Sequence, residues 1–122
     1  MPVKVLSIDD DVNMTNLLGI LLHDYGMDVI SANSSEDGLE LVRREKPDVI
    51  TLDLIMPGIS GWKLCSMIRS FSKTPIIIIT AVNDPVSIAA GLAAGANDYI
   101  VKPVMRNQLV TSINKFIFPY QQ

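Results

Sequence analysis

Residues 48–58 read DVITLDLIMPG, and this stretch decides the fold prediction. Asp48 to Leu52 form a short run rich in apolar and β-branched residues, which predicts a buried strand. Asp53 follows this run directly, at the point where the chain leaves the predicted strand. Pro57 and Gly58 then indicate a turn. The stretch therefore predicts a strand that delivers one carboxylate to a loop at its carboxyl end.

The same succession of apolar run, polar loop and amphipathic segment recurs along the chain. Strands are expected at 3–8, 28–32, 48–52, 76–79 and 99–101, and helices at 13–25, 34–45, 62–71, 85–94 and 107–118. Asp84 before Pro85 is typical of a helix start, and Gly26 and Gly95 are typical of helix ends. This alternation predicts an α/β fold, a doubly wound parallel sheet of five strands with helices on both faces.

The composition is that of one compact domain. The chain has 122 residues, of which 48% are hydrophobic and 19% charged, so it can bury a core and disorder is excluded. The net charge of −3 gives no reason to expect direct binding to nucleic acid. We expect one domain over residues 1–118, with residues 119–122 as a tail or the start of a linker.

The cysteine count and the apolar runs bear on location. A single cysteine, Cys65, excludes an internal disulfide and fits a reducing compartment. The apolar run Ile76 to Ile79 has the length of a strand, and we see no run of the length that crosses a membrane. We therefore expect a cytoplasmic protein without membrane contact.

Polar residues stand at the ends of four predicted strands. The first strand ends at Asp9 and Asp10, the third at Asp53, the fourth at Thr80 and the fifth at Lys102. Parallel sheets bind ligands at the carboxyl ends of their strands, so these side chains are expected to meet at one edge. Three adjacent carboxylates repel each other, and a divalent cation such as Mg²⁺ relieves that repulsion. With an ammonium and a hydroxyl beside it, the site suits a phosphoryl group, which a carboxylate can also accept covalently.

Four motifs carry a family resemblance: Ile8-Asp9-Asp10, the run Leu52 to Gly58, Thr80-Ala81 and Lys102-Pro103. In order and spacing they resemble the receiver domains of two-component response regulators, over essentially the whole chain. The resemblance implies the flavodoxin-like, CheY-like strand order 2-1-3-4-5. It also implies a signalling switch that takes a phosphoryl group from a histidine kinase or a histidine phosphotransfer protein.

By position in the family, Asp53 corresponds to the phosphoacceptor. Asp9, Asp10, Asp53 and the backbone carbonyl of Ile55 correspond to the groups that hold Mg²⁺, with Mn²⁺ as an alternative ion. The resemblance thus implies phosphorylation that depends on a divalent metal. Such a domain promotes its own phosphorylation and dephosphorylation only, so we do not expect an enzyme with turnover.

Four further positions correspond to the family's switch. Lys102 matches the residue that pairs with Asp53 and then with the phosphoryl oxygens, and Pro103 matches a proline that is commonly cis. Thr80 matches the hydroxyl that moves toward the phosphoryl group, and Tyr99 the aromatic residue that then turns inward. Their coupling would change the face formed by the fourth helix, fifth strand and fifth helix, where a downstream protein or output domain binds. The resemblance also allows a dimer that forms on phosphorylation.

Several neighbouring residues are more individual. Ile55 and Val82 are apolar at the positions that line the path of the hydrolytic water in this family, which predicts slow loss of the phosphoryl group. Leu18 is expected in the core, whereas Val12 and Met14 are core or kinase-docking residues. Trp62 packs between helices or marks a partner surface. His23 is expected at the surface near a helix end.

Parts of the same sequence are also compatible with two other functions. Taken singly, the three aspartates at 9–11 could be a solvated turn with Asp11 as a helix cap, and Lys102 a surface charge. One alternative is an interaction module that keeps the fold without using phosphate. Another is an aspartate-dependent phosphatase, which needs a second acid two residues after its nucleophile; Asp11 meets this after Asp9, but Ile55 does not after Asp53.

Overall fold

The computed structural model describes residues 2–117, and strands and helices alternate along the chain. The strands are β1 Val3–Ile8, β2 Met27–Ala32, β3 Val49–Leu52, β4 Ile76–Thr80 and β5 Asp98–Val101, and the helices are α1 Val12–His23, α2 Ser35–Glu45, α3 Gly61–Arg69, α4 Pro85–Ala93 and α5 Arg106–Ile117. All ten predicted elements are present, and their ends differ from the predicted ones by a few residues at most. The predicted tail at 119–122 and the predicted helix end at Phe118 lie outside the described residues.

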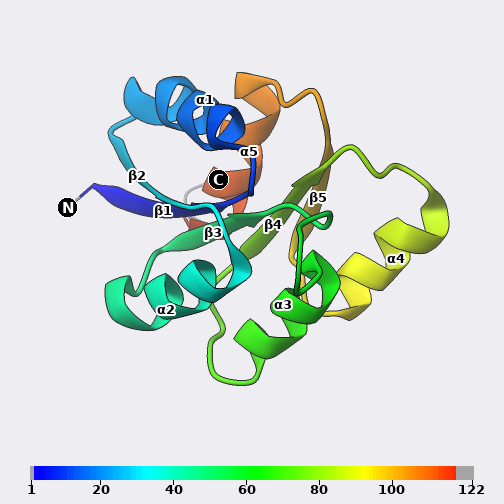
Figure 1. Cartoon of the computed structure of the whole chain (residues 1–122). Helices are drawn as coiled ribbons and strands as arrows, with labels where there is room; N and C mark the ends of the chain where they lie inside the picture. The colour runs from blue at the N-terminus through cyan, green and yellow to red at the C-terminus, as the bar shows by residue number, and fades with distance from the viewer. Residues whose placement is uncertain (1, 118–122) are drawn as a thin grey trace.

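The five strands form one parallel sheet in the order β2-β1-β3-β4-β5, as predicted (Figure 1). Ile8 pairs with both Ala32 and Leu52, so β1, β2 and β3 end at the same level. The backbone N–H of Asp53 donates to the carbonyl of Ile8 at 3.0 Å. The chain therefore leaves β1 and β3 side by side, with an aspartate at each exit.

Helices cover both faces of the sheet, with α1 and α5 on one side and α2 and α3 on the other (Figure 1). Successive strand residues point to opposite faces, so Val5 and Val49 pack beneath α1 and α5 while Leu6 and Ile50 pack beneath α2 and α3. Leu18 and Ile113 fill the first core. Each such side chain contributes about 1.5–3 kcal/mol on burial. Two cores on one sheet hold the strand ends in fixed positions.

Short polar side chains start the first four helices. In each case the oxygen of the residue before the helix accepts a backbone N–H of the first turn; these residues are Asp11, Ser34, Ser60 and Asp84. Such caps satisfy backbone donors that the helix itself cannot, each contributing about 1 kcal/mol. Among them, Asp11 and Ser60 also fix the loops that carry the acidic residues.

Gly61 opens α3 directly against the backbone of the loop that follows β3. A Cβ at this position would clash with the backbone of Asp53 and Leu54. We expect Gly61→Ala to lower the free energy of unfolding by about 1–3 kcal/mol, because the buried backbone around it must shift. Gly19→Ala is the matched control, since its Cβ would meet nothing within 4 Å and alanine favours a helix. Urea unfolding of both variants measures the difference; equal stability would contradict the close packing.

Within residues 2–117, no helix combines the length and the apolar character that a membrane crossing requires.

Candidate functional site

Three carboxylates gather at the carboxyl edge of the sheet. One oxygen from each of Asp9, Asp10 and Asp53 lies within 4.8 Å of the others. Asp9 is 4% exposed and Asp53 is 7% exposed, whereas Asp10 is open to solvent. The oxygens come from the ends of β1 and β3, which the sheet register holds side by side. This cluster of hard oxygen ligands, open on one side, could hold a divalent metal ion.

Lys102 follows the end of β5, and its side chain reaches the carboxylate cluster. Its Nζ donates to Asp9 Oδ2 and to Asp53 Oδ2, each at 3.1 Å. The pairing with Asp53 had a basis in the resemblance, but the contact with Asp9 did not. Burial works to lower the pKa of Lys102, and the hydrogen bonds to Asp9 and Asp53 outweigh it, so the pKa is raised. Lys102 is therefore a fixed positive charge at neutral pH. Its peptide bond to Pro103 is cis.

Burial raises the pKa of Asp9 above its ordinary value, and the nearby charge of Asp53 adds to this. The backbone N–H of Asp11 and the ammonium of Lys102 act in the opposite direction without cancelling the effect. Because the folded pKa exceeds the unfolded one, the contribution of Asp9 to stability falls as the pH rises through the window between the two values. The ionised form of Asp9 is thus destabilised by burial and by the charge of Asp53, and a bound cation would favour it.

Asn33 is a site residue that the sequence did not indicate. It follows β2, and its amide donates to the backbone carbonyl of Asp9 at 2.8 Å and to Thr15 Oγ1 at 3.3 Å. It thereby ties the acidic loop to the neighbouring strand end and to α1. The one available signal was its position directly after a predicted strand, the criterion that selected Asp9, Asp53 and Lys102.

Thr80 and Tyr99 lie on the neighbouring strands β4 and β5. The Thr80 hydroxyl is buried and has no hydrogen-bond partner within the part of the chain that the structure describes. The Tyr99 hydroxyl donates to the carbonyl of Val82 in the β4–α4 loop at 2.6 Å. A buried hydroxyl without a partner carries a desolvation cost, and an incoming acceptor would remove it.

The loop after Asp53 turns back on its carboxylate. The backbone N–H of Ile55 donates to Asp53 Oδ1 at 3.2 Å, and the Ile55 side chain is 58% exposed. Val82, two residues after Thr80, is half-buried. The residues two positions after Asp53 and Thr80 are therefore both apolar and at least partly exposed.

The family model described as "Response regulator receiver domain" matches residues 5–114. The chain belongs to this family. It is the receiver domain of a two-component response regulator, a class of signalling switches whose phosphodonors include histidine kinases.

Relatives and solved structures agree with this membership. The chain is 45% identical over 101 residues to the transcriptional regulatory protein AfsQ1 of Streptomyces coelicolor, covering 83% of this chain and 45% of that protein. It is 36% identical over 113 residues to the DNA-binding response regulator MtrA of Mycobacterium tuberculosis, covering 93% and 50%. A two-component response regulator from Clostridium difficile superposes with a TM-score of 0.93 at 28% identity, covering 98% of this chain and 99% of that one.

The receiver domain spans about half the length of these curated relatives. Their names describe a transcriptional regulator and a DNA-binding regulator. The expectation of no direct nucleic-acid binding therefore stays a prediction, and it concerns this domain alone.

The other residues of interest in this receiver domain have clear positions. Leu18 lies in the core at 1% exposed and Met14 is buried at 9%, whereas Val12 is 55% exposed at the start of α1. Trp62 is half-buried, and its Nε1 donates to the Ser87 carbonyl of α4 at 3.4 Å, which favours helix packing. His23 is exposed at the end of α1, as predicted.

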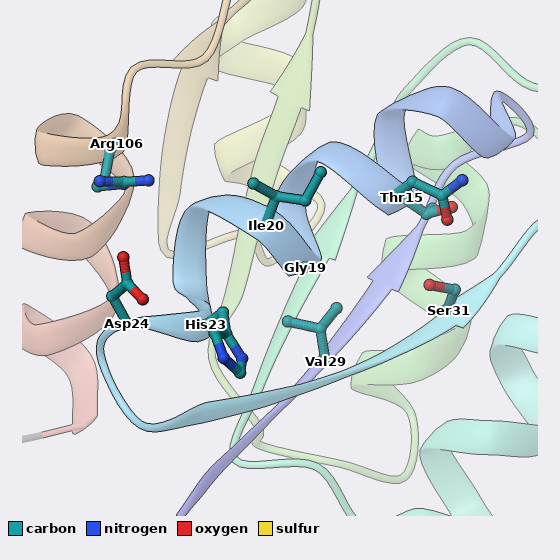
Figure 2. Close-up of a pocket in the computed structure, with 9 residues that line it drawn as sticks. Thr15, Gly19, Ile20, His23, Asp24, Val29, Ser31 and Arg106 are labelled. Atoms are coloured by element: carbon teal, nitrogen blue, oxygen red, sulfur yellow. The ribbon is translucent and has the colours of Figure 1, made fainter.

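A hollow of about 770 Å³ is lined by residues of α1, β2 and α5, and none of the three clustered aspartates is among them (Figure 2). Its wall on α1 includes Thr15 and Ile20, and β2 and the start of α5 complete it with Ser31 and Arg106. Ile20 is 65% exposed in this hollow. The receiver domain therefore presents both apolar and polar groups around α1.

Proposed function

We propose that Asp53 of this receiver domain accepts a phosphoryl group in a reaction that depends on Mg²⁺. The observation that carries the proposal is the contact of its carboxylate with Lys102 Nζ at 3.1 Å, inside the cluster with Asp9 and Asp10. Carboxylate oxygens are the ligands that Mg²⁺ prefers. The cluster is also open on one side, which leaves room for the water molecules that Mg²⁺ keeps. Asp9, Asp10, Asp53 and the Ile55 carbonyl would hold the ion, and Mn²⁺ is an alternative.

In the proposed reaction a carboxylate oxygen of Asp53 attacks the phosphorus of a phosphohistidine. The phosphorus–nitrogen bond breaks, and its electron pair leaves with the imidazole nitrogen, which takes up a proton. Lys102 binds a phosphoryl oxygen and offsets its charge, and the Thr80 hydroxyl donates to another. The bound metal supplies further charge neutralisation.

Phosphorylation would then be read on the face formed by α4, β5 and α5. Thr80 ends β4, and within residues 2–117 its hydroxyl has no hydrogen-bond partner, while the Tyr99 hydroxyl donates to the Val82 carbonyl in the β4–α4 loop that follows. Gly91 is the one buried residue of the nine in α4, so this helix is held by few core contacts. A weakly held helix beside the site is suited to shift between two arrangements. A downstream protein, an output domain or a second copy of the chain would bind this face.

Exposed apolar side chains beside the rim favour docking of the phosphodonor there. Val12 on α1 is 55% exposed and Met105 in the β5–α5 loop is 62% exposed. Val12 follows the acidic end of β1, and Met105 follows the end of β5 that carries Lys102, so a histidine kinase or phosphotransfer protein bound over them would bring its phosphohistidine to Asp53.

Incubation with acetyl phosphate tests the function. We expect the intact mass to rise by one phosphoryl group with Mg²⁺ and not with a chelator. We also expect a change in the emission of Trp62, the one tryptophan of the chain, because it contacts α4. No mass gain under conditions that phosphorylate related domains would instead favour the pure interaction module.

The phosphatase alternative has a specific observation against it. Asp11, the candidate second acid, accepts the backbone N–H of Asn13 at 2.9 Å as the cap of α1. We therefore propose no turnover on other phosphate esters, and only self-phosphorylation and autodephosphorylation.

We assign residues 1–118 to one receiver domain. A cytoplasmic location is supported by Cys65, a free and buried thiol.

The apolar residues Ile55 and Val82, which we call the apolar rim, predict a long-lived phosphoryl group. Neither Ile55 nor Val82 can orient the attacking water by hydrogen bonding, so we expect slow dephosphorylation. The double variant Ile55→Asn with Val82→Glu should lose the group about tenfold faster, since positioning a water through polar groups typically contributes this much or more. Phosphoprotein decay after removal of acetyl phosphate measures the rate. Unchanged or slower decay in the double variant counts against the apolar rim as the cause.

A further inference from the structure

A second hollow lies at the end of the sheet opposite the carboxylates. It has a volume of about 560 Å³ and is lined by the last turn of α2 and by residues 71–74, which lead into β4. The strands are parallel, so the start of β4 and the end of α2 are remote from the rim that carries Asp53. This hollow is thus distinct from the phosphoacceptor site.

Its charge is positive in a protein of net charge −3. Arg43, Lys46 and Lys73 line it, and no carboxylate is among the lining residues. Within residues 2–117, none of the three forms an ion pair. The acidic residues of the same helix end are engaged elsewhere, since Glu40 pairs with Arg44, and Glu45 with Lys4 and Arg44. All three residues are exposed, so the hollow presents positive charge to solvent without a paired carboxylate.

Lys46 occupies a position where glycine is the favoured residue. It follows α2 with a φ of 47°, in the left-handed region. A side chain in this conformation costs about 1 kcal/mol relative to glycine. The chain nevertheless keeps a lysine here. Attraction to the carboxyl end of the helix offsets part of this cost, but it does not explain two more unpaired cations around the same hollow.

The wall opposite α2 is held in place before any ligand arrives. Arg69 donates to the Ser72 carbonyl at 3.2 Å and to the Gly95 carbonyl at 2.9 Å, which fixes the segment before β4. The Ser72 hydroxyl donates to Thr74 Oγ1 at 2.9 Å, which leaves the Thr74 hydroxyl hydrogen available to a ligand. The Phe71 ring lies 4.3 Å from the Arg43 guanidinium and restricts it. A restrained wall lowers the entropic cost of binding.

We propose that this hollow binds the oligophosphate group of a small ligand, either free pyrophosphate or a nucleoside di- or triphosphate. An arginine fork, two ammonium groups and a hydroxyl donor match several phosphate oxygens at once. The volume lies in the range of small-molecule sites. The site lies apart from Asp53 and does not require its phosphorylation.

Titration calorimetry with pyrophosphate, in a chelator and at low salt, tests the proposal. We expect one saturable site per chain. Lys46→Gly should weaken binding by about tenfold, as the loss of one charge-assisted contact would. The melting temperature of this variant should equal or exceed that of the wild type, which excludes unfolding as the cause. Lys73→Met should weaken binding similarly, and the matched control Lys63→Met, an exposed lysine outside the hollow, should not.

Adenosine, ADP and ATP identify the source of the phosphate. Equal affinity for pyrophosphate and ATP would mean recognition of the oligophosphate alone, and tighter binding of ATP would mean a nucleotide site. Absence of saturable binding for pyrophosphate, ADP and ATP would overturn the proposal, and so would binding of adenosine as tight as that of ATP. So would a loss on Lys63→Met equal to that on Lys46→Gly, since binding would then reflect diffuse charge.

Discussion

Replacing Asp53 with asparagine is expected to abolish the mass gain from acetyl phosphate while leaving the protein at least as stable as the wild type. An amide oxygen is a poor nucleophile and cannot form the acyl phosphate. The substitution also removes one of two buried carboxylates, and Lys102 keeps its hydrogen bond to Asp9. Less repulsion in the absence of metal should raise the free energy of unfolding by about 1 kcal/mol.

Intact mass and urea unfolding check both parts of this prediction. Asp28→Asn is the matched control, because Asp28 is exposed on β2 and lies outside the acidic cluster. It should be phosphorylated like the wild type. A mass gain that persists in Asp53→Asn would show that another residue is the phosphoacceptor.

Replacing Lys102 with methionine should have the largest effect on stability. Its ammonium donates to both Asp9 and Asp53, and these two residues are 4% and 7% exposed. Without it two buried charges face each other uncompensated, which should lower the free energy of unfolding by about 3 kcal/mol. Phosphorylation should also slow, since one positive charge no longer meets the phosphoryl oxygens.

Two conditions should restore the stability of this variant. Mg²⁺ replaces the missing charge, and a lower pH protonates Asp9, whose pKa burial raises, so stability should rise as the pH falls toward the raised pKa of Asp9. Lys115→Met is the control, because Lys115 is 54% exposed and pairs with Asp98 at 3.5 Å, which predicts a loss of about 1 kcal/mol at most. Urea unfolding with and without Mg²⁺ measures these changes. If Lys102→Met is no less stable than Lys115→Met, Lys102 does not compensate the cluster.

The sequence predicted most of the fold and of the site because both follow from where apolar runs stop. Ile8 and Leu52 end buried strands, and the aspartates after them had to emerge at the carboxyl edge of the sheet. Asp11 was predicted as a helix cap from its place before an amphipathic segment, and it caps α1. Local pattern carries this information because strand and helix ends are set by nearby residues.

Contacts between distant segments could not be predicted in this way. The hydrogen bond from Asn33 to the Asp9 carbonyl depends on the register of β1 against β2, and the bond from Lys102 to Asp9 on the side-chain conformation at the end of β5. The closeness of Gly61 to Asp53 reflects how tightly the loop folds back. Spacing along the chain does not determine rotamers or loop paths, so these contacts required the structure.

A calorimetric titration with Mg²⁺ tests most directly whether Asp9, Asp10 and Asp53 act as one metal site. For the wild type we predict one saturable Mg²⁺ site per chain. Binding should weaken by about tenfold or more in Asp10→Asn, because the exposed carboxylate of the cluster is lost, and it should be unchanged in Asp28→Asn. No uptake by the wild type, or equal uptake by Asp10→Asn, would contradict a metal site built from these three carboxylates.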